Sequence, residues 1–160
     1  MIIAPLIQVA AAAVSATGAC PAAGGSTVEV RIDGFRRRVG QVRVRLFGNP
    51  PASYFDKHRA LVRVEMPVPA SGPVRLCVAA PGPGVYALDV RHDVNGNGKT
   101  DKQDGGGASG NPHVSLLDVV FGRKPAPASV QFRVGTGTTV VPVTLTYLQG
   151  GSFQRVADGR

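Results

Sequence analysis

Residues 86–92 read Tyr-Ala-Leu-Asp-Val-Arg-His, and the fold follows from this stretch. Its large apolar side chains recur at every second position, at Tyr86, Leu88 and Val90. A period of two is typical of a β-strand with one buried face, whereas an amphipathic helix has a period near 3.6. His92 continues the same face, so we expect it at the edge of the core, hydrogen-bonded to the loop that follows. The stretch therefore predicts a half-buried strand.

The same period of two recurs along the chain from residue 27 onward. It predicts six further strands, around residues 28–32, 42–46, 62–66, 74–78, 130–134 and 141–147. Seven strands with one apolar face each cannot all bury those faces in a single open sheet, whereas two sheets packed face to face bury them together. We therefore predict an all-β fold: a single antiparallel β-sandwich of about seven strands. It would occupy residues 20–160 as one domain, with its core at about residues 27–148.

The turn-forming residues add detail to this sandwich. The 21 Gly and 13 Pro among 160 residues indicate many turns and little helix, because both residues interrupt helices. Pro142 lacks the N–H that a central strand donates, so the last strand is expected at a sheet edge. Residues 105–114 are rich in Gly and are expected to form a pliable loop. One short helix is expected around Ser115–Phe121.

The formal net charge of +8 raises the question of an anionic partner. Nucleic acid is not the expected one, because the basic residues are scattered apart from Arg36-Arg37-Arg38, and the interleaved aromatic residues that stack on bases are missing. We expect instead a solvated basic face that associates weakly with anionic surfaces of the cell envelope.

The first twenty residues carry no charge and pass from an apolar run to small residues. This pattern predicts a secretory signal peptide at residues 1–19, cleaved after Ala16 or Ala19, and hence a periplasmic or extracellular protein. The apolar run is too short and too rich in Ala to predict a transmembrane span. The alternative is that it forms the first buried strand or helix of the domain.

The chain has two cysteines, Cys20 and Cys77. In an exported protein an even pair suggests one disulfide. The alternation around Cys77 places it on the outward face with Arg75, where a segment running over the sheet would meet it. Two alternatives stay open: Cys20 as the lipid-anchored first residue of a lipoprotein, or two unpaired thiols.

The loop that follows the strand at 86–92 carries a pattern of oxygen-bearing residues. With Asp93 as the first position, oxygen ligands fall at the first, third, fifth, seventh, ninth and twelfth positions, and Gly98 stands at the sixth. This is close to the calcium loop of EF-hands. We therefore predict a weak Ca²⁺ site, with a dissociation constant on the order of 10⁻⁴–10⁻³ M. Its ligands would be Asp93, Asn95, Asn97, the carbonyl of Lys99, Asp101 and Asp104. The alternative is a metal-free turn in which these side chains bond to their own backbone.

No sequence pattern of an enzyme is evident, because the chain has no nucleophile elbow, phosphate-binding loop or zinc signature. We expect a non-catalytic binding or structural module of the cell envelope, whose partner would be an anionic polymer, a carbohydrate or another protein. The alternative is a metal-dependent or acid–base enzyme that uses His92 and Asp93, with His113 as a further candidate.

Two segments carry a resemblance to a known family. Residues 40–47 read GQVRVRLF and residues 83–101 read PGVYALDVRHDVNGNGKTD. They resemble the exported bacterial family called Domain of Unknown Function 2141, over roughly residues 27–148. The resemblance implies a transthyretin-like or immunoglobulin-like sandwich outside the cytoplasm, with no established activity. The chain departs from the family pattern at residues 105–125, so a family function that resides in that segment is not expected to be inherited by this chain.

Overall fold

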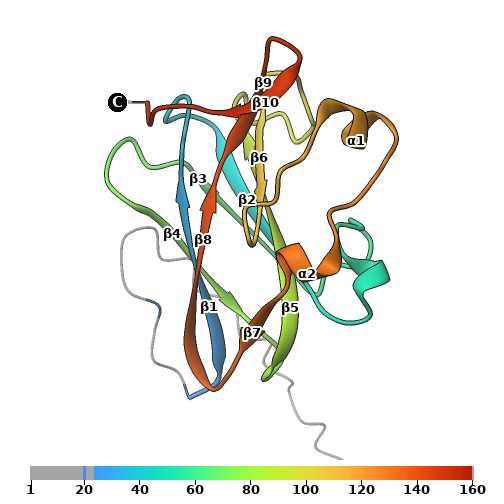
Figure 1. Cartoon of the computed structure of the whole chain (residues 1–160). Coiled ribbons are helices and arrows are strands. Elements are labelled where there is room, and N and C mark those ends of the chain that lie inside the picture. The colour runs from blue at the N-terminus through green and yellow to red at the C-terminus, as the bar shows by residue number, and fades with distance from the viewer. Residues whose placement is uncertain (1–19, 21–23, 160) are drawn as a thin grey trace, which may run out of the picture.

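The computed structural model describes Cys20 and residues 24–159. The expected signal peptide at residues 1–19 lies outside the described residues. The described part forms ten strands, one 3-10 turn and two short helices (Figure 1). In chain order these are β1 (Ser26–Asp33), β2 (Gln41–Phe47), η1 (Pro51–Ser53), β3 (Val62–Pro67), β4 (Val74–Ala79), β5 (Gly84–Asp93), β6 (Gly105–Ala108), α1 (Leu116–Val120), α2 (Pro127–Val130), β7 (Phe132–Val134), β8 (Gly137–Thr144), β9 (Thr146–Gln149) and β10 (Ser152–Arg155).

The strands form two sheets, as the alternating pattern predicted. The smaller sheet has the order β4-β1-β8, and the larger has the order β10-β9-β6-β5-β2-β3, with β7 paired to the start of β5. The paired strands run antiparallel except β1 and β8, which are parallel, so the sandwich is mixed rather than purely antiparallel. Strand β8 pairs with β1 at the edge of the smaller sheet, which confirms the position expected from Pro142.

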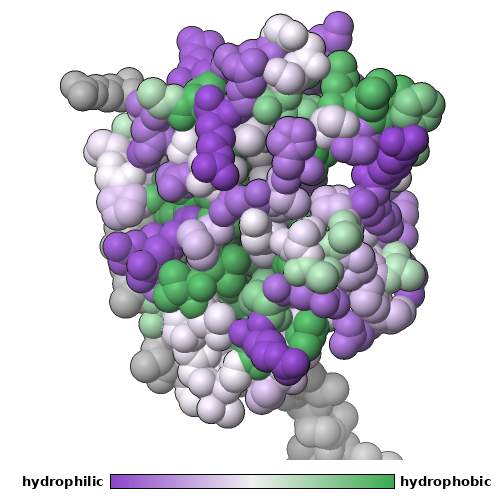
Figure 2. Space-filling model, viewed as in Figure 1, coloured by the Kyte–Doolittle hydropathy of each residue, from purple (hydrophilic) through white to green (hydrophobic). Residues whose placement is uncertain are grey.

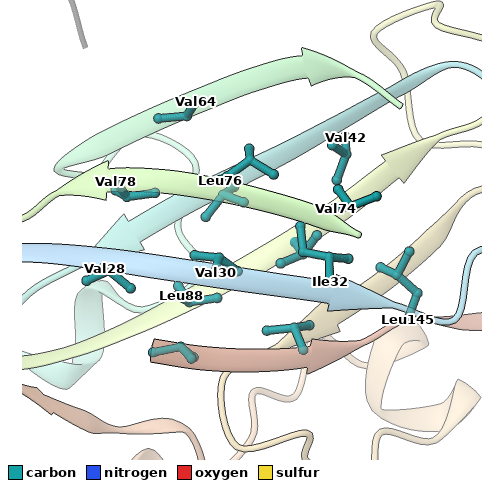
Figure 3. Packing of buried hydrophobic residues seen from close by; sticks show 14 of the residues in the cluster. Val28, Val30, Ile32, Val42, Val64, Val74, Leu76, Val78, Leu88 and Leu145 are labelled. Carbon is teal, nitrogen blue, oxygen red and sulfur yellow. The ribbon is translucent and has the colours of Figure 1, made fainter. Parts of the chain in front are cut away.

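The inward faces of the two sheets pack against each other to form the core (Figure 3). Val28, Val30 and Leu76 come from the smaller sheet, and Val44 and Leu88 from the larger, and all five are fully buried. Burying one such side chain stabilises a fold by about 1.5–3 kcal/mol, and the whole cluster includes 22 buried residues. The predicted β-sandwich is therefore confirmed.

A disulfide joins Cys20 to Cys77, with a Cα–Cα distance of 5.4 Å. It lies on the outer side of the smaller sheet, because Cys77 points away from the inward residues Leu76 and Val78. This confirms the predicted pairing. Such bonds persist in oxidising compartments.

The structure also corrects the assignment of three segments. Gly105–Ala108 was expected in a pliable loop but forms strand β6. Its three glycines have no side chains, so the sequence shows no alternation of apolar residues there. The run 141–147 is two strands, because the chain leaves the smaller sheet at Leu145 and enters the larger one. Val130 ends helix α2 instead of beginning a strand. The expected short helix is present as α1, with Ser115 as its N-cap.

Candidate functional site

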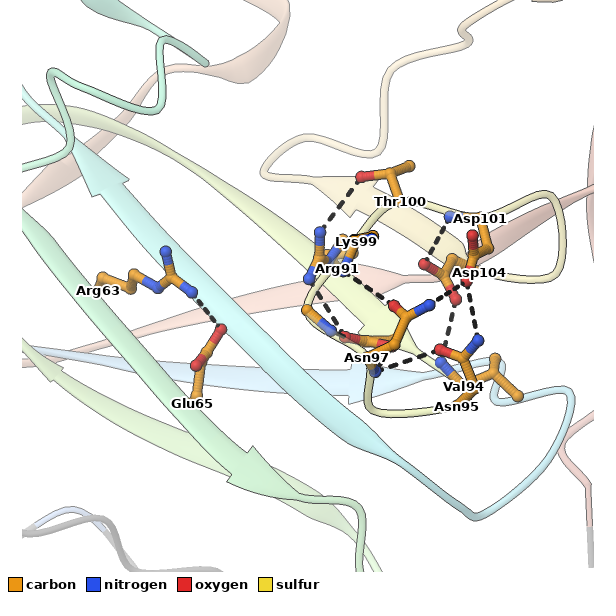
Figure 4. Close-up of polar contacts among 12 residues, drawn as sticks. Arg63, Glu65, Arg91, Val94, Asn95, Asn97, Lys99, Thr100, Asp101 and Asp104 are labelled. Carbon is orange, nitrogen blue, oxygen red and sulfur yellow. Dashed lines mark hydrogen bonds and ion pairs between the residues drawn. The ribbon is translucent and has the colours of Figure 1, made fainter.

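The polar loop between β5 and β6 is held by hydrogen bonds among its own residues (Figure 4), and two buried carboxylates fix its ends. Asp93 is 4% exposed, and its oxygens accept hydrogen bonds from the backbone N–H of Asn97 (3.2 Å) and Gly98 (2.7 Å). Asp104 is 8% exposed, and it accepts from the N–H of Val94 (3.1 Å) and Asp101 (2.9 Å). Both side chains therefore serve as backbone acceptors that fix the ends of the loop.

Three other predicted ligands converge at the exposed surface of this loop. The amide nitrogens of Asn95 and Asn97 each lie 2.8 Å from the same oxygen of Asp101. Asn97 also accepts a hydrogen bond from the N–H of Lys99 (2.8 Å). No group of three or more His, Cys, Asp or Glu in the described part of the chain has the arrangement of a metal site. The loop thus has the hydrogen bonds of a metal-free turn, and calcium binding stays a prediction.

His92 lies in the core rather than at its edge, and it does not bond to the polar loop. Its Nε2 is 2.7 Å from the carbonyl of Val39, and its Nδ1 is 2.6 Å from the hydroxyl of Tyr147. Since a carbonyl only accepts, Nε2 carries the proton and Nδ1 accepts from Tyr147. Burial lowers the pKa of His92 and raises that of Tyr147 to about 12. The ring is therefore neutral and has no contact with solvent.

An open cleft of about 540 Å³ lies on the outer face of the larger sheet. Gly106 and Ala108 of β6 form part of its floor, Phe55 and Phe153 contribute aromatic walls, and the loop 111–114 borders it. Gly106 has no side chain to fill the space, and a Cβ built on it would find its nearest atom, the Val90 carbonyl oxygen, 3.9 Å away. The missing side chain is one physical reason why the cleft exists.

Arginines of β2 and β5 continue the cleft along the same face. A neighbouring hollow of about 290 Å³ shares Gly106 and Phe153 with the cleft. Its charged lining residues are Arg43, Arg91, Lys102, Asp89, Asp101 and Asp104. The sheet register explains this continuity, because Arg43 stands opposite Arg91, which in turn stands opposite Gly106.

Arg43 of β2 lacks a carboxylate partner among the described residues, as does the exposed Arg155 of β10, which borders the cleft. Arg45 binds Asp89 through two hydrogen bonds, and Arg91 lies 3.3 Å from Asp93. Arg43 makes no ion pair within the described chain, and its buried Nε has no hydrogen-bond partner there. Burial and the charges of Arg45 and Arg91 lower its pKa, so a neighbouring anion would stabilise its charged form.

The sequence patterns did not predict this cleft. The alternation of β2 and β5 does place their arginines on an outward face, which is the one available signal. The cleft itself is assembled from segments as distant as Phe55, Gly106 and Phe153, and its floor is a strand of glycines.

Comparison with known proteins gives one family and no individual relative. The family described as "Uncharacterized protein conserved in bacteria (DUF2141)" matches residues 30–142. No curated protein and no solved structure matches the chain significantly.

Proposed function

The chain belongs to the bacterial family DUF2141, and from that premise we propose that it is an exported, non-catalytic binding module of the cell envelope. The disulfide supports an oxidising compartment, and the net charge of +8 favours an anionic partner. In the described part of the chain no helix is long and apolar enough to cross a membrane.

The ligand we propose is a segment of an anionic polymer, such as an acidic polysaccharide, held in the cleft above β6. The single observation that carries this proposal is that the cleft continues onto Arg43, a cation with no carboxylate partner among the described residues. Of the carboxylates that line the same hollow, Asp89 is neutralised by Arg45, and Asp101 and Asp104 accept hydrogen bonds within the polar loop. A carboxylate or phosphate group beside Arg43 would supply the missing acceptor, while sugar rings lie against Phe55 and Phe153.

Direct titration with polygalacturonate, with neutral dextran as the comparison polymer, tests this proposal. The wild-type protein should bind the acidic polymer and not dextran. Arg43→Gln should weaken binding by about tenfold or more, because a charge-assisted hydrogen bond contributes about 1.5–3 kcal/mol. Gly106→Leu should also weaken binding by filling the cleft, and the open space at this position should leave the fold intact.

Arg75→Gln is the matched control for Arg43→Gln. Arg75 also has a buried Nε without a partner in the described structure, but it lies on β4 of the smaller sheet, away from the cleft. If Arg75→Gln and Arg43→Gln weaken binding equally, the attraction comes from net charge alone and the proposed site is wrong. If Gly106→Leu has no effect, the ligand does not occupy the cleft.

Export has its own test, independent of the ligand. Mass spectrometry of the protein from its native host should show a chain that begins after Ala16 or Ala19. An intact Met1 would contradict the proposed compartment.

The geometry favours binding over an acid–base enzyme that uses His92 and Asp93. His92 is fully buried and both of its ring nitrogens are engaged. Asp93 is directed into the turn by the N–H groups of Asn97 and Gly98. Neither side chain is placed to exchange a proton with a substrate.

We also propose that a weakly bound Ca²⁺ stabilises the loop from Asp93 to Asp104. The specific observation is the convergence of Asn95, Asn97 and Asp101 on one point. Rotation of the two amides by 180° would place three oxygens there, and a cation would then replace the two N–H donors. These rotations would give up the hydrogen bond that Asn97 accepts from the N–H of Lys99 and the one that Asn95 accepts from the N–H of Asn97, so weak affinity is expected.

A further inference from the structure

The segment 115–124, here called the apolar knuckle, exposes an unusual concentration of large hydrophobic side chains. Leu117, Val119, Val120 and Phe121 are 61%, 55%, 67% and 66% exposed. Figure 2 shows hydrophobic residues gathered at the upper right of the molecule, where α1 lies in Figure 1. Single exposed apolar residues are ordinary, but a contiguous group marks an interaction surface.

The apolar knuckle is already folded without a partner. Ser115 and Asp118 form a capping box at the start of α1. The N–H groups of Asp118, Val119, Phe121, Gly122 and Arg123 all have acceptors within the segment. An apolar phase penalises unpaired backbone groups, so this segment can enter one with these donors satisfied.

The chemistry of the apolar knuckle fits a lipid surface. The four exposed side chains carry no hydrogen-bonding group that would specify a directional partner. Two cations stand at the end of the segment. Arg123 has its guanidinium 5.3 Å from the ring centre of Phe121 and 4.0 Å from the carboxylate of Asp118, and Lys124 has its Nζ 3.3 Å from the carbonyl of Ala52. With Asp118 included, the segment carries a net charge of +1. Apolar side chains flanked by basic ones are typical of segments that enter the interface of anionic membranes.

We propose that the apolar knuckle inserts into the surface of a bilayer that contains anionic lipid. This inference does not rest on the proposed polymer ligand. It adds an orientation to the molecule, because Val114 and Pro125, which flank the knuckle on either side, line the cleft. Docking through the knuckle therefore brings the mouth of the cleft close to the membrane.

Co-sedimentation with vesicles tests the insertion. The wild-type chain should bind vesicles of phosphatidylcholine with phosphatidylglycerol more strongly than vesicles of phosphatidylcholine alone. The double variant Leu117→Ser/Val120→Ser should lose about tenfold or more in binding, because two side chains no longer leave water on insertion. Both changes lie at exposed positions and leave the capping box in place.

Leu61→Ser/Val140→Ser is the matched control. It makes the same two chemical changes at positions that are 52% and 44% exposed but lie outside the knuckle. It should bind vesicles as the wild type does. The uncharged stretch 1–19, where present, is the same in all of these chains, so its contribution cancels in the comparison.

A fluorescent probe reports insertion at the knuckle itself. The chain contains no Trp, so Phe121→Trp introduces a single indole. Its emission should shift to the blue with anionic vesicles, whereas the emission of Val140→Trp should not. The proposal is overturned if the wild type binds neither kind of vesicle, if both double variants lose binding equally, or if the Phe121→Trp emission stays unchanged. A different result would assign the surface to a second copy of the chain. In that case the wild type would form concentration-dependent dimers and bind no vesicles, and Leu117→Ser/Val120→Ser would abolish the dimers.

Discussion

At the scale of single residues, His92 links parts of the chain that are far apart in sequence. Its ring packs edge-on against Phe35 and Tyr147, with centroids 5.1 and 5.9 Å away. Tyr147 donates to Nδ1 of His92 and accepts from the N–H of Arg36 (3.2 Å). The period of β5 correctly predicted that His92 points inward. It could not predict Tyr147 or Val39 as partners, because a strand period identifies a face and not what lies across from it.

This buried imidazole makes the stability of the fold depend on pH. Burial holds the pKa of His92 below the value of about 6.5 that it has in an unfolded chain. Between these two pKa values the unfolded chain binds more protons, so the free energy of unfolding falls as the pH falls below about 6.5. The urea midpoint of the wild type should therefore decrease from about pH 7.5 to about pH 5.5.

The variant His92→Gln separates this effect from other titrations. It should be less stable than the wild type at neutral pH, because it leaves polar groups of the core without partners. Its midpoint should nevertheless change less over the same pH range. Equal pH dependence in both proteins would show that another group is responsible.

At the scale of structural elements, β6 is a strand that depends on glycine. A Cβ on Gly105 would lie 2.5 Å from a ring carbon of Tyr147, and one on Gly107 would lie 2.6 Å from Val143. The backbone of β6 therefore passes close to the side chains of two other strands. The absence of side chains allows this packing, and it also explains why the strand was invisible as a period in the sequence.

Gly105→Ala should destabilise the fold by about 1–3 kcal/mol, the usual cost of overpacking a filled core. The added methyl group would displace Tyr147, which is fully buried and bonded to His92. Gly135→Ala is the control, because no atom of the described residues lies within 4 Å of the place that its methyl group would take. Chemical denaturation of both variants measures the difference. Equal stability would mean that Tyr147 can move at no cost.

The alternation of apolar residues was sufficient to predict some strands but not the break between two others. Strands β1 to β5 were all predicted, because each carries apolar residues on one face and charged ones on the other. The break between β8 and β9 at Leu145 was not predicted. The N–H of Leu145 bonds to the carbonyl of Asp33 in the smaller sheet, whereas Tyr147 pairs with Gly105 in the larger sheet. The side chains alternate through this change of sheet without interruption. Only the hydrogen-bond partners differ, and a sequence pattern does not contain them.

The loop between β5 and β6 provides the test for calcium. Millimolar Ca²⁺ should raise the thermal midpoint of the wild type relative to chelator. The stabilisation is on the order of 1–2 kcal/mol when the ion exceeds its dissociation constant about tenfold. Asp101→Asn should remove the effect, because it takes a charged oxygen from the point where Asn95 and Asn97 converge. The backbone N–H of Asp101 would still bond to Asp104, so the turn should be retained.

Asp56→Asn is a suitable control for the calcium experiment. It removes a carboxylate in an unrelated loop, where Asp56 accepts from the N–H of His58 (2.9 Å). Its response to calcium should match that of the wild type. If calcium and chelator give the wild type the same midpoint, the loop functions only as a hydrogen-bonded turn.

At the scale of the whole molecule, the two sheets carry different features on their outer faces. The smaller sheet covers the core and carries the disulfide. The larger sheet carries the cleft and the arginines, and the apolar knuckle follows its strand β6. The end of the chain returns to the sandwich, where Asp158 accepts from the N–H of Phe35 (2.7 Å). The sequence predicted the sandwich from an alternation of apolar residues that recurs along the chain, and the disulfide from its pair of cysteines. It did not predict the cleft, which exists only after distant segments have met.

The disulfide is expected to stabilise this assembly without being required for it. It joins residues 57 positions apart and so restricts the unfolded chain, which corresponds to about 2–4 kcal/mol. The buried core cluster contains neither cysteine, so the sheets keep their packing after reduction. Thermal melts of the wild type should show a lower midpoint with reductant but one cooperative transition in both conditions. The double variant Cys20→Ser/Cys77→Ser should melt at the reduced midpoint and should not respond to reductant. Loss of the cooperative transition on reduction would mean that the disulfide is essential for folding. An unchanged midpoint, with both thiols titratable, would mean that the disulfide contributes nothing to stability.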